Sequence, residues 1–327
     1  MQSDRQSVWR SLRWPVVAAT ALALLALAVV AVWAPDRSVE TLSARWAPAP
    51  SRFITVGGLR AHLRDEGPRD DSVPVVLLHG TSASLHTWEG WATALRTDHR
   101  VIRMDLPGFG LTGPTADNDY SIESYVRFTL ALLDSLGVKR FNIAGNSLGG
   151  EIAWHVTAAA PERVQHMVLV DAAGFPMSST SMPIGFRMAR TQSLAWLMTR
   201  ILPKAVVAWS VKSVYGNPAL VSDSLIDRYF ELTLRAGNRA SLPQRFAQSK
   251  PGADTALLRG LKVPTLILWG AKDGLIPPDH ATRFARDIAG SRMILYDGVG
   301  HVPQEEAPAK TVADVRAFLA PSVTANR

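Results

Sequence analysis

The stretch FNIAGNSLGGEIAWHVTAAA, residues 141–160, decides the fold. It opens with an apolar run typical of a buried strand, residues 141–144, and closes with a helical pattern. Between them lies Gly145-Asn146-Ser147-Leu148-Gly149, which fits G-x-S-x-G. A sharp turn from strand to helix needs glycines on both sides of the serine, because side chains there would collide with the neighbouring strand and helix. The sequence therefore predicts that Ser147 stands out from this turn as a nucleophile.

A serine hydroxyl is a poor nucleophile until a base takes its proton, so a histidine must come close to Ser147. Of the eight histidines, His301 is the best placed. It ends the loop Asp297-Gly298-Val299-Gly300-His301, which follows the last predicted strand and precedes a terminal helix. We therefore expect His301 to be the base.

A carboxylate from another strand end must orient the imidazole and stabilise its charged form. Asp273 follows the predicted strand at residues 263–269, and the chain order serine, aspartate, histidine is the one expected for this kind of turn. Asp171, at the end of the strand at 167–170, is a rival for the same role. Asp105 is expected to hold a Pro-Gly turn together rather than to take part in chemistry.

Acyl transfer also needs two hydrogen-bond donors for the developing oxyanion, and backbone amides suit this role because they are fixed before the reaction. The segment His79-Gly80-Thr81-Ser82 follows a predicted strand and supplies one donor. We expect the two donors to be the amides of Thr81 and of Leu148, the residue after the nucleophile. His79 itself is expected to be structural.

Strands and helices alternate along most of the chain, which predicts a mostly parallel sheet with helices on both faces. A helix is expected at residues 122–136, with Ser121 as N-cap and Gly137 as stop. A hairpin is expected at residues 52–64. Continuous apolar runs predict buried strands at residues 73–78, 101–104, 141–144, 167–170, 263–269 and 293–296.

The alternation stops between residues 174 and 260. That span has helical spacing, is rich in aromatic residues and methionine, and contains no run that resembles a buried strand. We interpret residues 175–259 as a helical cap inserted in a core formed by residues 52–174 and 260–327.

The N-terminal segment has its own composition. Residues 14–34 contain no charged residue, and about 20 helical residues cover the roughly 30 Å core of a bilayer. We predict that residues 1–35 form a single membrane anchor, followed by a tether at 36–51. Cleavage as a secretory signal is the alternative. Three arginines precede the apolar run and two follow it, which favours a catalytic domain on the extracytoplasmic side.

Composition excludes several other classes. The chain has no cysteine, which removes disulfides, thiolate zinc sites and a cysteine nucleophile. Its formal charge of +7 suits an anionic surface. The basic residues are scattered among acids and form no coherent phosphate footprint, so no nucleic-acid partner is expected.

Several motifs occur in order along the chain: His79-Gly80, DLPGFG at 105–110, the turn at Ser147, WGAKD at 269–273 and Gly300-His301. Because these motifs follow one another in the same order in the α/β-hydrolase superfamily, the chain resembles that superfamily. The resemblance runs from about Arg52 to Leu319. It implies an eight-stranded core sheet, a cap inserted after the sixth strand, and hydrolysis through an acyl-enzyme without any cofactor.

The resemblance leaves the reaction open. Haloalkane dehalogenases and epoxide hydrolases of this fold use an aspartate nucleophile, whereas this chain has Ser147. Carbon-carbon bond hydrolases for ring-cleavage products are similar in order and cap placement. The chain departs from them at residues 81–84, where their oxyanion loop is glycine-rich, and at Val302, where they usually carry tryptophan. Cofactor-free perhydrolases share the same triad.

We therefore expect a membrane-anchored serine hydrolase that cleaves carboxylic esters of small or apolar substrates. A carbon-carbon bond hydrolase or a perhydrolase of the same fold is the alternative. A catalytically silent protein that binds a hydrophobic ligand is the alternative from another class.

Overall fold

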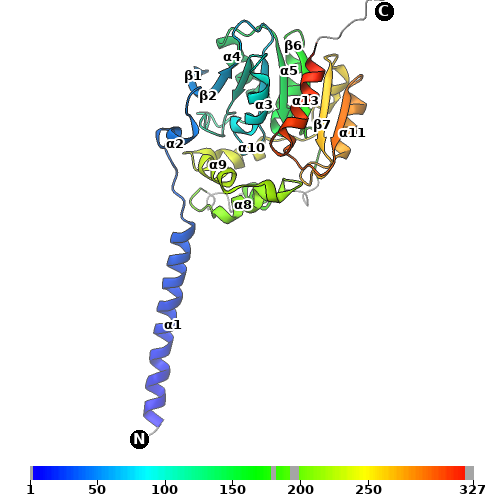
Figure 1. Cartoon of the computed structure of the whole chain (residues 1–327). Helices are drawn as coiled ribbons and strands as arrows, with labels where there is room; N and C mark the ends of the chain where they lie inside the picture. The colour runs from blue at the N-terminus through cyan, green and yellow to red at the C-terminus, as the bar shows by residue number, and fades with distance from the viewer. Residues whose placement is uncertain (1–2, 178–181, 192–198, 321–327) are drawn as a thin grey trace, which may run out of the picture.

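In the computed structural model, residues 3–177, 182–191 and 199–320 are described, and their centre is one eight-stranded sheet (Figure 1). The predicted segments at 1–35 and 175–259 therefore include some residues outside the described ones. The strands lie in the order β1-β2-β4-β3-β5-β6-β7-β8. Their bounds are β1 Arg52–Val56, β2 Leu59–Glu66, β3 Val75–Leu78, β4 Val101–Met104, β5 Phe141–Asn146, β6 Val164–Val170, β7 Thr265–Gly270 and β8 Arg292–Tyr296.

The sheet is mostly parallel, as the alternating pattern predicts. β1 and β2 form the antiparallel hairpin expected at residues 52–64, and β2 pairs antiparallel with β4. All pairs from β4 to β8 are parallel. Each predicted strand is confirmed, with small shifts at the ends. The carboxyl ends of β3, β5, β6 and β7 therefore meet at one edge, where ligand sites of parallel sheets form.

Side-chain alternation along β3 explains why helices cover both faces. Val76 and Leu78 pack in one core cluster together with residues of α4 (Ile122–Ser135) and α5 (Leu148–Ala159). Val75 and Leu77 point to the opposite face and pack in a second cluster with residues of α3 (Glu89–Leu95) and α13 (Pro308–Leu319). Successive strand residues face opposite ways, so an uninterrupted apolar run must be covered on both sides.

The helices fall into three groups. Those of the core are α3 Glu89–Leu95, α4 Ile122–Ser135, α5 Leu148–Ala159, α11 Asp279–Asp287, α12 Pro303–Glu306 and α13 Pro308–Leu319, with the 3₁₀ turn η1 Leu85–Trp88. Those between β6 and β7 are α6 Ile184–Arg190, α8 Lys204–Ser213, α9 Asp223–Thr233 and α10 Asn238–Gln248, with η3 Pro218–Leu220 and η4 Thr255–Gly260. Two N-terminal helices are α1 Ser3–Val32 and α2 Val39–Trp46.

The helices between β6 and β7 lie at one end of the sheet (Figure 1), and we call residues 175–259 the cap. Its described part contains helices and no strand, as the sequence predicts. The exact boundaries of cap and core stay a prediction. Because the cap helices, beginning with α6, lie in the chain between the carboxyl end of β6 and β7, the cap is placed at the strand ends that carry the predicted site.

The segment expected to be a tether contains a packed helix. Ser38 caps α2 by accepting a hydrogen bond from the Thr41 amide at 3.2 Å. Leu42 and Trp46, one turn apart, are buried in a small cluster with a cap residue of α9. The Trp46 indole also donates to Glu231 Oε2 at 2.7 Å. Pattern analysis missed this helix because its eight residues are too few to show a clear period.

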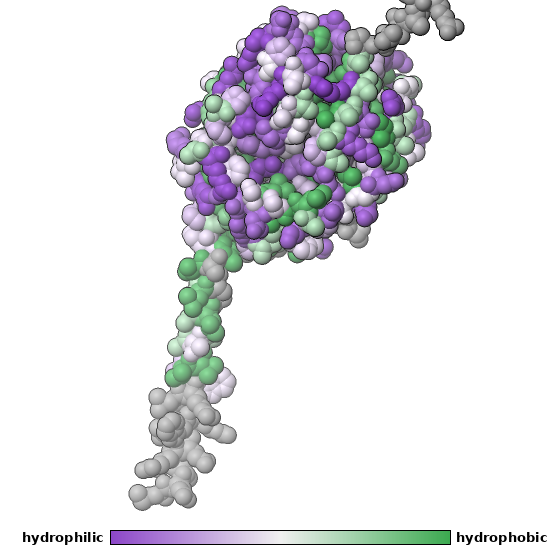
Figure 2. Space-filling view, viewed as in Figure 1, coloured by the Kyte–Doolittle hydropathy of each residue, from purple (hydrophilic) through white to green (hydrophobic). Residues whose placement is uncertain are grey.

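The predicted membrane anchor corresponds to α1, which projects from the rest of the molecule (Figure 1). Its described large apolar side chains are exposed, for example Trp14 at 78% and Leu27 at 65%. The part of this stem that is coloured in Figure 2 is mainly green, that is, hydrophobic. Among residues 3–177, 182–191 and 199–320, however, no helix combines the length and apolar character that a membrane crossing needs. The structure therefore gives the predicted transmembrane helix no support.

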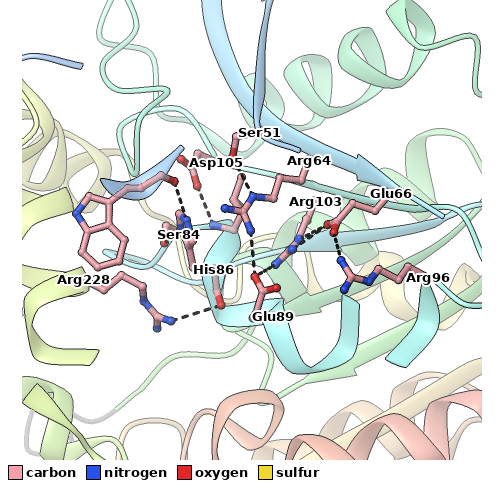
Figure 3. A network of polar contacts seen from close by, with 12 residues as sticks. Ser51, Arg64, Glu66, Ser84, His86, Glu89, Arg96, Arg103, Asp105 and Arg228 are labelled. Atoms are coloured by element: carbon pink, nitrogen blue, oxygen red, sulfur yellow. Dashed lines mark hydrogen bonds and ion pairs between the residues drawn. The ribbon is translucent and has the colours of Figure 1, made fainter. Parts of the chain in front are cut away.

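A buried charged network ties β2, β4 and α3 together (Figure 3). The Arg103 guanidinium on β4 is fully buried and donates to Glu66 Oε2 at 2.8 and 3.0 Å and to Glu89 Oε2 at 2.7 Å. Arg64 also donates to Glu89, and Arg96 also donates to Glu66. A buried charge is tolerated only when its partners are close, so the three elements depend on Arg103.

We expect Arg103→Met to lower the free energy of unfolding by about 3 kcal/mol, because it leaves the buried Glu66 carboxylate with only Arg96. Chemical denaturation followed by circular dichroism measures this. The matched control is Arg127→Met, which removes an exposed pair with Asp119 and should cost less than about 1 kcal/mol. Equal losses in the two variants would contradict the role given to Arg103.

Candidate active site

The turn at Ser147 has the geometry that its glycines predict. Ser147 lies between β5 and α5 with φ +54° and ψ −117°, a conformation that is strained for a residue with a side chain. A Cβ atom on Gly145 would lie 2.0 Å from the Gly149 carbonyl oxygen, and one on Gly149 would lie 2.1 Å from that of Leu78. Both positions therefore require glycine, as expected.

His301 and Asp273 are brought together from two loops. His301 Nδ1 lies 2.7 Å from Asp273 Oδ2, and both side chains are buried. The other carboxylate oxygen, Oδ1, accepts hydrogen bonds from the amides of Leu275 and Ile276 at 2.8 and 2.9 Å. Asp273 is thus fixed, and it turns the imidazole so that Nε2 is the free nitrogen.

Asp171, the rival acid, lies beside this pair but makes a different contact. Its Oδ1 accepts a hydrogen bond from the Gly270 amide at 3.0 Å, and its backbone has φ +43°. Burial, reinforced by the nearby Asp273 carboxylate, raises the pKa of Asp171 well above its ordinary value. The raised pKa favours the protonated form of Asp171, whereas Asp273 holds the histidine.

The site also contains three side chains close enough to hold a metal ion together. They are Asp171, Asp273 and His301, whose potential ligand atoms lie within 4.8 Å of one another. The set coincides with the predicted acid and base. The 2.7 Å bond between His301 and Asp273 already engages one donor from each of these two residues.

The residues predicted to supply the oxyanion donors, Thr81 and Leu148, line one cavity together with Ser147. Leu148 is the first residue of α5, whose N-terminal amides are not used within the helix. Thr81 follows β3 and lies in the wall of the same cavities as Ser147. His79 donates from Nδ1 to the Gly80 carbonyl at 2.7 Å and accepts from the Leu106 amide at Nε2. Burial lowers its pKa, so it is neutral and structural, as expected.

Asp105 anchors the neighbouring loops. Its carboxylate accepts hydrogen bonds from the amides of Leu85 and Leu111, both at 2.7 Å, and lies 2.7 Å from His62 Nδ1. Burial alone would raise the pKa of this carboxyl, but His62 and the other nearby histidines hold it well below its ordinary value. The expected structural role of Asp105 is consistent with these contacts.

Ser147 lies at the junction of two cavities. The larger has a volume of about 250 Å³ and runs between the core and the cap. His301 and Val302 also line it. None of its described lining residues is a lysine, arginine, aspartate or glutamate. Its cap wall is almost entirely apolar: Phe186, Met188, Ile201, Leu202, Val206, Val207, Val211, Val214 and Leu242.

The smaller cavity has a volume of about 70 Å³ and is also lined by Ser147 and Leu148. Unlike the larger one, it contains charged side chains, namely Glu151, Arg190 and Arg245. Arg245 is 95% buried, being 5% exposed. No sequence pattern pointed to these residues, because Arg245 and Glu151 are 94 positions apart in the chain.

A second group that the sequence did not reveal joins the cap to the loop of His301. Glu305 accepts hydrogen bonds from Arg228 at 2.7 and 2.8 Å and from the hydroxyls of Tyr215 and Tyr229 at 2.8 and 3.1 Å. Arg228 also donates to the His86 carbonyl oxygen (Figure 3). The His301 amide donates to the Val214 carbonyl oxygen at 2.7 Å. Cap and histidine loop therefore form one unit.

The sequence model for the alpha/beta hydrolase fold matches residues 73–308, which is most of the chain. The chain belongs to the alpha/beta hydrolase fold family. This confirms the resemblance noted for its motifs, and the strand order and the turn at Ser147 agree with it.

Individual relatives of this alpha/beta hydrolase cover most of its length. The 2-hydroxymuconate semialdehyde hydrolase of Pseudomonas sp. strain CF600 is 27% identical over 84% of this chain and 95% of its own. A meta-cleavage product hydrolase from Pseudomonas fluorescens IP01 has the same fold, with a TM-score of 0.71, 24% identity, and coverage of 82% and 96%. A structure described as a membrane phospholipase A, a bacterial virulence factor, has a TM-score of 0.70 at 23% identity and covers 97% of this chain and 98% of its own.

We expect Asp171→Asn to stabilise this hydrolase increasingly as the pH rises above about 4, the ordinary range of an aspartate. The raised pKa means that the folded state keeps a proton that the unfolded state has released, so the wild type loses stability with rising pH. Asparagine is neutral at every pH and escapes this loss. The difference in unfolding free energy should grow by about 1.4 kcal/mol per pH unit while Asp171 stays protonated.

Urea unfolding of both proteins at pH 5, 6 and 7 measures this difference. The control is Asp287→Asn, at a carboxyl whose pKa is lowered by Arg286, which should show no such gain. A constant difference across the three pH values would mean that Asp171 is ionised in the folded state.

Proposed function

We propose that this chain is a serine hydrolase with Ser147 as nucleophile, His301 as base and Asp273 as acid. The proposal is supported by the strained turn that presents Ser147 and by the 2.7 Å contact between His301 and Asp273. Ser147 and His301 line the same cavity. The backbone amides of Thr81 and Leu148 are the proposed oxyanion donors.

The reaction follows from these positions. Ser147 Oγ bonds to the substrate carbonyl carbon while its proton passes to His301 Nε2, and Asp273 stabilises the imidazolium. The leaving oxygen takes that proton and departs, which gives an acyl-enzyme. A water molecule then gives a proton to His301 and attacks the acyl carbon, which releases the acid and restores Ser147.

We propose carboxylic esters with an apolar acyl or aromatic part as the substrates. One observation carries this choice: the cavity of about 250 Å³ that ends at Ser147 has no charged wall residue among those described, apart from the proposed base itself. Such a cavity favours apolar groups by excluding their surface from water. Val302, next to the base, is buried against the cap residues Val211 and Tyr215 and extends this apolar wall.

Cleavage of a carbon-carbon bond is the second candidate. The names of the relative from Pseudomonas sp. strain CF600 and of the structure from Pseudomonas fluorescens favour it over ester hydrolysis. The departures at residues 81–84 and at Val302 favour the ester. Both reactions use the same nucleophile and base, so the leaving atom, carbon or oxygen, is what distinguishes them.

We expect a fluorophosphonate probe to label the wild-type chain and to leave Ser147→Ala unlabelled, because only an activated serine reacts. Wild-type hydrolysis of p-nitrophenyl esters graded from two to twelve carbons should rise with acyl length until the cavity is full. In Ser147→Ala the rate should fall by a factor of about 10⁴ or more. Ser82→Ala, in the cavity wall, is the matched control and should keep the label.

Three results would change the proposal. Ester hydrolysis that persists in Ser147→Ala would remove this residue as nucleophile. A folded wild type without label would indicate the silent ligand-binding protein. Rapid cleavage of a vinylogous 1,5-diketone together with slow cleavage of every ester would establish the carbon-carbon reaction instead.

We further propose that the exposed apolar side chains of α1 attach the enzyme to lipid, with the catalytic domain on the extracytoplasmic side. The support is their exposure, from 60% at Val17 to 78% at Trp14, which is costly in water. Trp33, at the end of this helix, forms a β-bridge with Ile201 in the wall of the larger cavity. Attachment would thus hold the cavity near an apolar phase.

We expect the full-length wild type to sediment with vesicles of phosphatidylcholine and phosphatidylglycerol, and the double variant Leu24→Asp with Leu27→Asp to bind at least tenfold more weakly. Two charges on this face must be desolvated for insertion. The control is Leu257→Asp, at an exposed leucine of the cap, which should sediment like the wild type. A wild type that stays in the supernatant would refute attachment.

A further inference from the structure

The smaller cavity beside Ser147 contains a guanidinium with unused hydrogen-bonding capacity. Arg245 Nη2 donates to Glu151 Oε2 at 3.1 Å, and both side chains are largely buried, with exposures of 7% and 12%. Arg245 Nε is buried and has no hydrogen-bond partner among the described residues. A buried donor without an acceptor costs about 1–3 kcal/mol, so Glu151 leaves the hydrogen-bonding capacity of Arg245, which lines this cavity, partly unused.

The charges around this cavity favour an anion over a cation. Its charged wall residues are two arginines, Arg190 and Arg245, and one carboxylate, Glu151, which leaves one positive charge in excess. Phe186 and Phe246 form part of the remaining, apolar wall. In such surroundings a charge-assisted hydrogen bond is about twice as strong as a neutral one.

The position of Ser147 divides a substrate between the two cavities. Because Ser147 lines both, a carbonyl carbon bound at its Oγ would have room for one substituent in each cavity. The larger one accepts the apolar part. The smaller, at about 70 Å³, is several times the ~10–15 Å³ needed for one water molecule, so a compact group fits.

We propose that the smaller cavity is a leaving-group subsite in which Arg245 binds an anionic oxygen group, a carboxylate or a phosphate, on the alcohol part of the substrate. This inference rests on the proposed function and extends it, because it assigns a polarity to each half of the substrate. Glu151 holds the guanidinium in place, and Arg190 adds to the positive field at the exposed end. The leaving alcohol takes its proton from His301 and departs through this cavity.

The test compares esters that share one apolar acyl group and differ in the alcohol. The alcohols are glycolate, 2-hydroxyethyl phosphate, neutral propanol and cationic ethanolamine. For the wild type we expect kcat/KM for the glycolate or the phosphate ester to exceed that for the ethanolamine ester at least tenfold. The better of the two anions distinguishes a carboxylate from a phosphate source.

In Arg245→Gln that preference should fall at least tenfold, while kcat/KM for the propyl ester changes less than threefold. Arg245→Lys should restore part of the preference, because the charge returns without the planar donor pair. Arg127→Gln, far out on α4, removes an exposed arginine and should change nothing. If Arg245→Gln folds poorly, Arg245→Gln combined with Glu151→Gln removes the unpaired carboxylate and should show the same loss.

Equal rates for anionic and cationic esters in the wild type would overturn the subsite. So would a loss in Arg245→Gln that is the same for all four esters, since this would make Arg245 merely structural. If the wild type hydrolyses none of the esters, including the propyl ester, the proposed function fails and the subsite fails with it.

Discussion

The close approach of three backbone segments at Ser147 is the constraint on which the rest of the structure depends. β3, β5 and the first turn of α5 meet where a single added methyl group on Gly149 would lie 2.1 Å from the Leu78 carbonyl oxygen. This closeness puts the strained serine at the carboxyl edge of the sheet. A strained residue persists only where its surroundings fix it, and here the Ser147 amide donates to Val170 and its carbonyl accepts from Ala173.

The second requirement is that residues far apart in the chain reach the same edge. Asp105 holds the loops after β3 and β4 through two amides, and Asp273 is fixed by the amides of Leu275 and Ile276. His301 depends on the cap as well as on the core, because its amide donates to Val214. A shift of the cap would therefore move the proposed base. In this enzyme the cap both shapes the cavity and positions the chemistry.

The two cavities at Ser147 differ in polarity, so the two halves of a substrate would meet different surroundings. The larger is apolar and has no lysine, arginine, aspartate or glutamate among its described wall residues, whereas the smaller is lined by Arg245 and Glu151. An ester and the product of aromatic ring cleavage can both be asymmetric in this way, which is consistent with relatives whose names point to carbon-carbon hydrolysis. The fold is common to both reactions, so the decision between them depends on the walls of the cavities and not on the sheet.

Much of this could be predicted from the sequence, because the signals are local. Apolar runs predicted six of the eight strands, and the hairpin expected at residues 52–64 accounted for the other two. Ser121 and Gly137 marked the ends of α4, and the glycines at 145 and 149 marked the turn at Ser147. The helix α2 was missed, since eight residues carry too little periodicity.

What the sequence by itself determined is the fold and the identity of Ser147 as a residue held in a strained turn, since neighbours within a few positions impose both. Only the tertiary structure decided between Asp171 and Asp273. Both follow parallel strands that lie side by side and both come near His301, but the hydrogen bond to the imidazole is made by Asp273, in the loop after β7. The sequence likewise did not reveal the contacts of Glu305 that join the cap to the loop of His301, or the pair of Arg245 with Glu151. Contacts between residues about 80 or more positions apart depend on how the whole chain packs, and no local pattern encodes them.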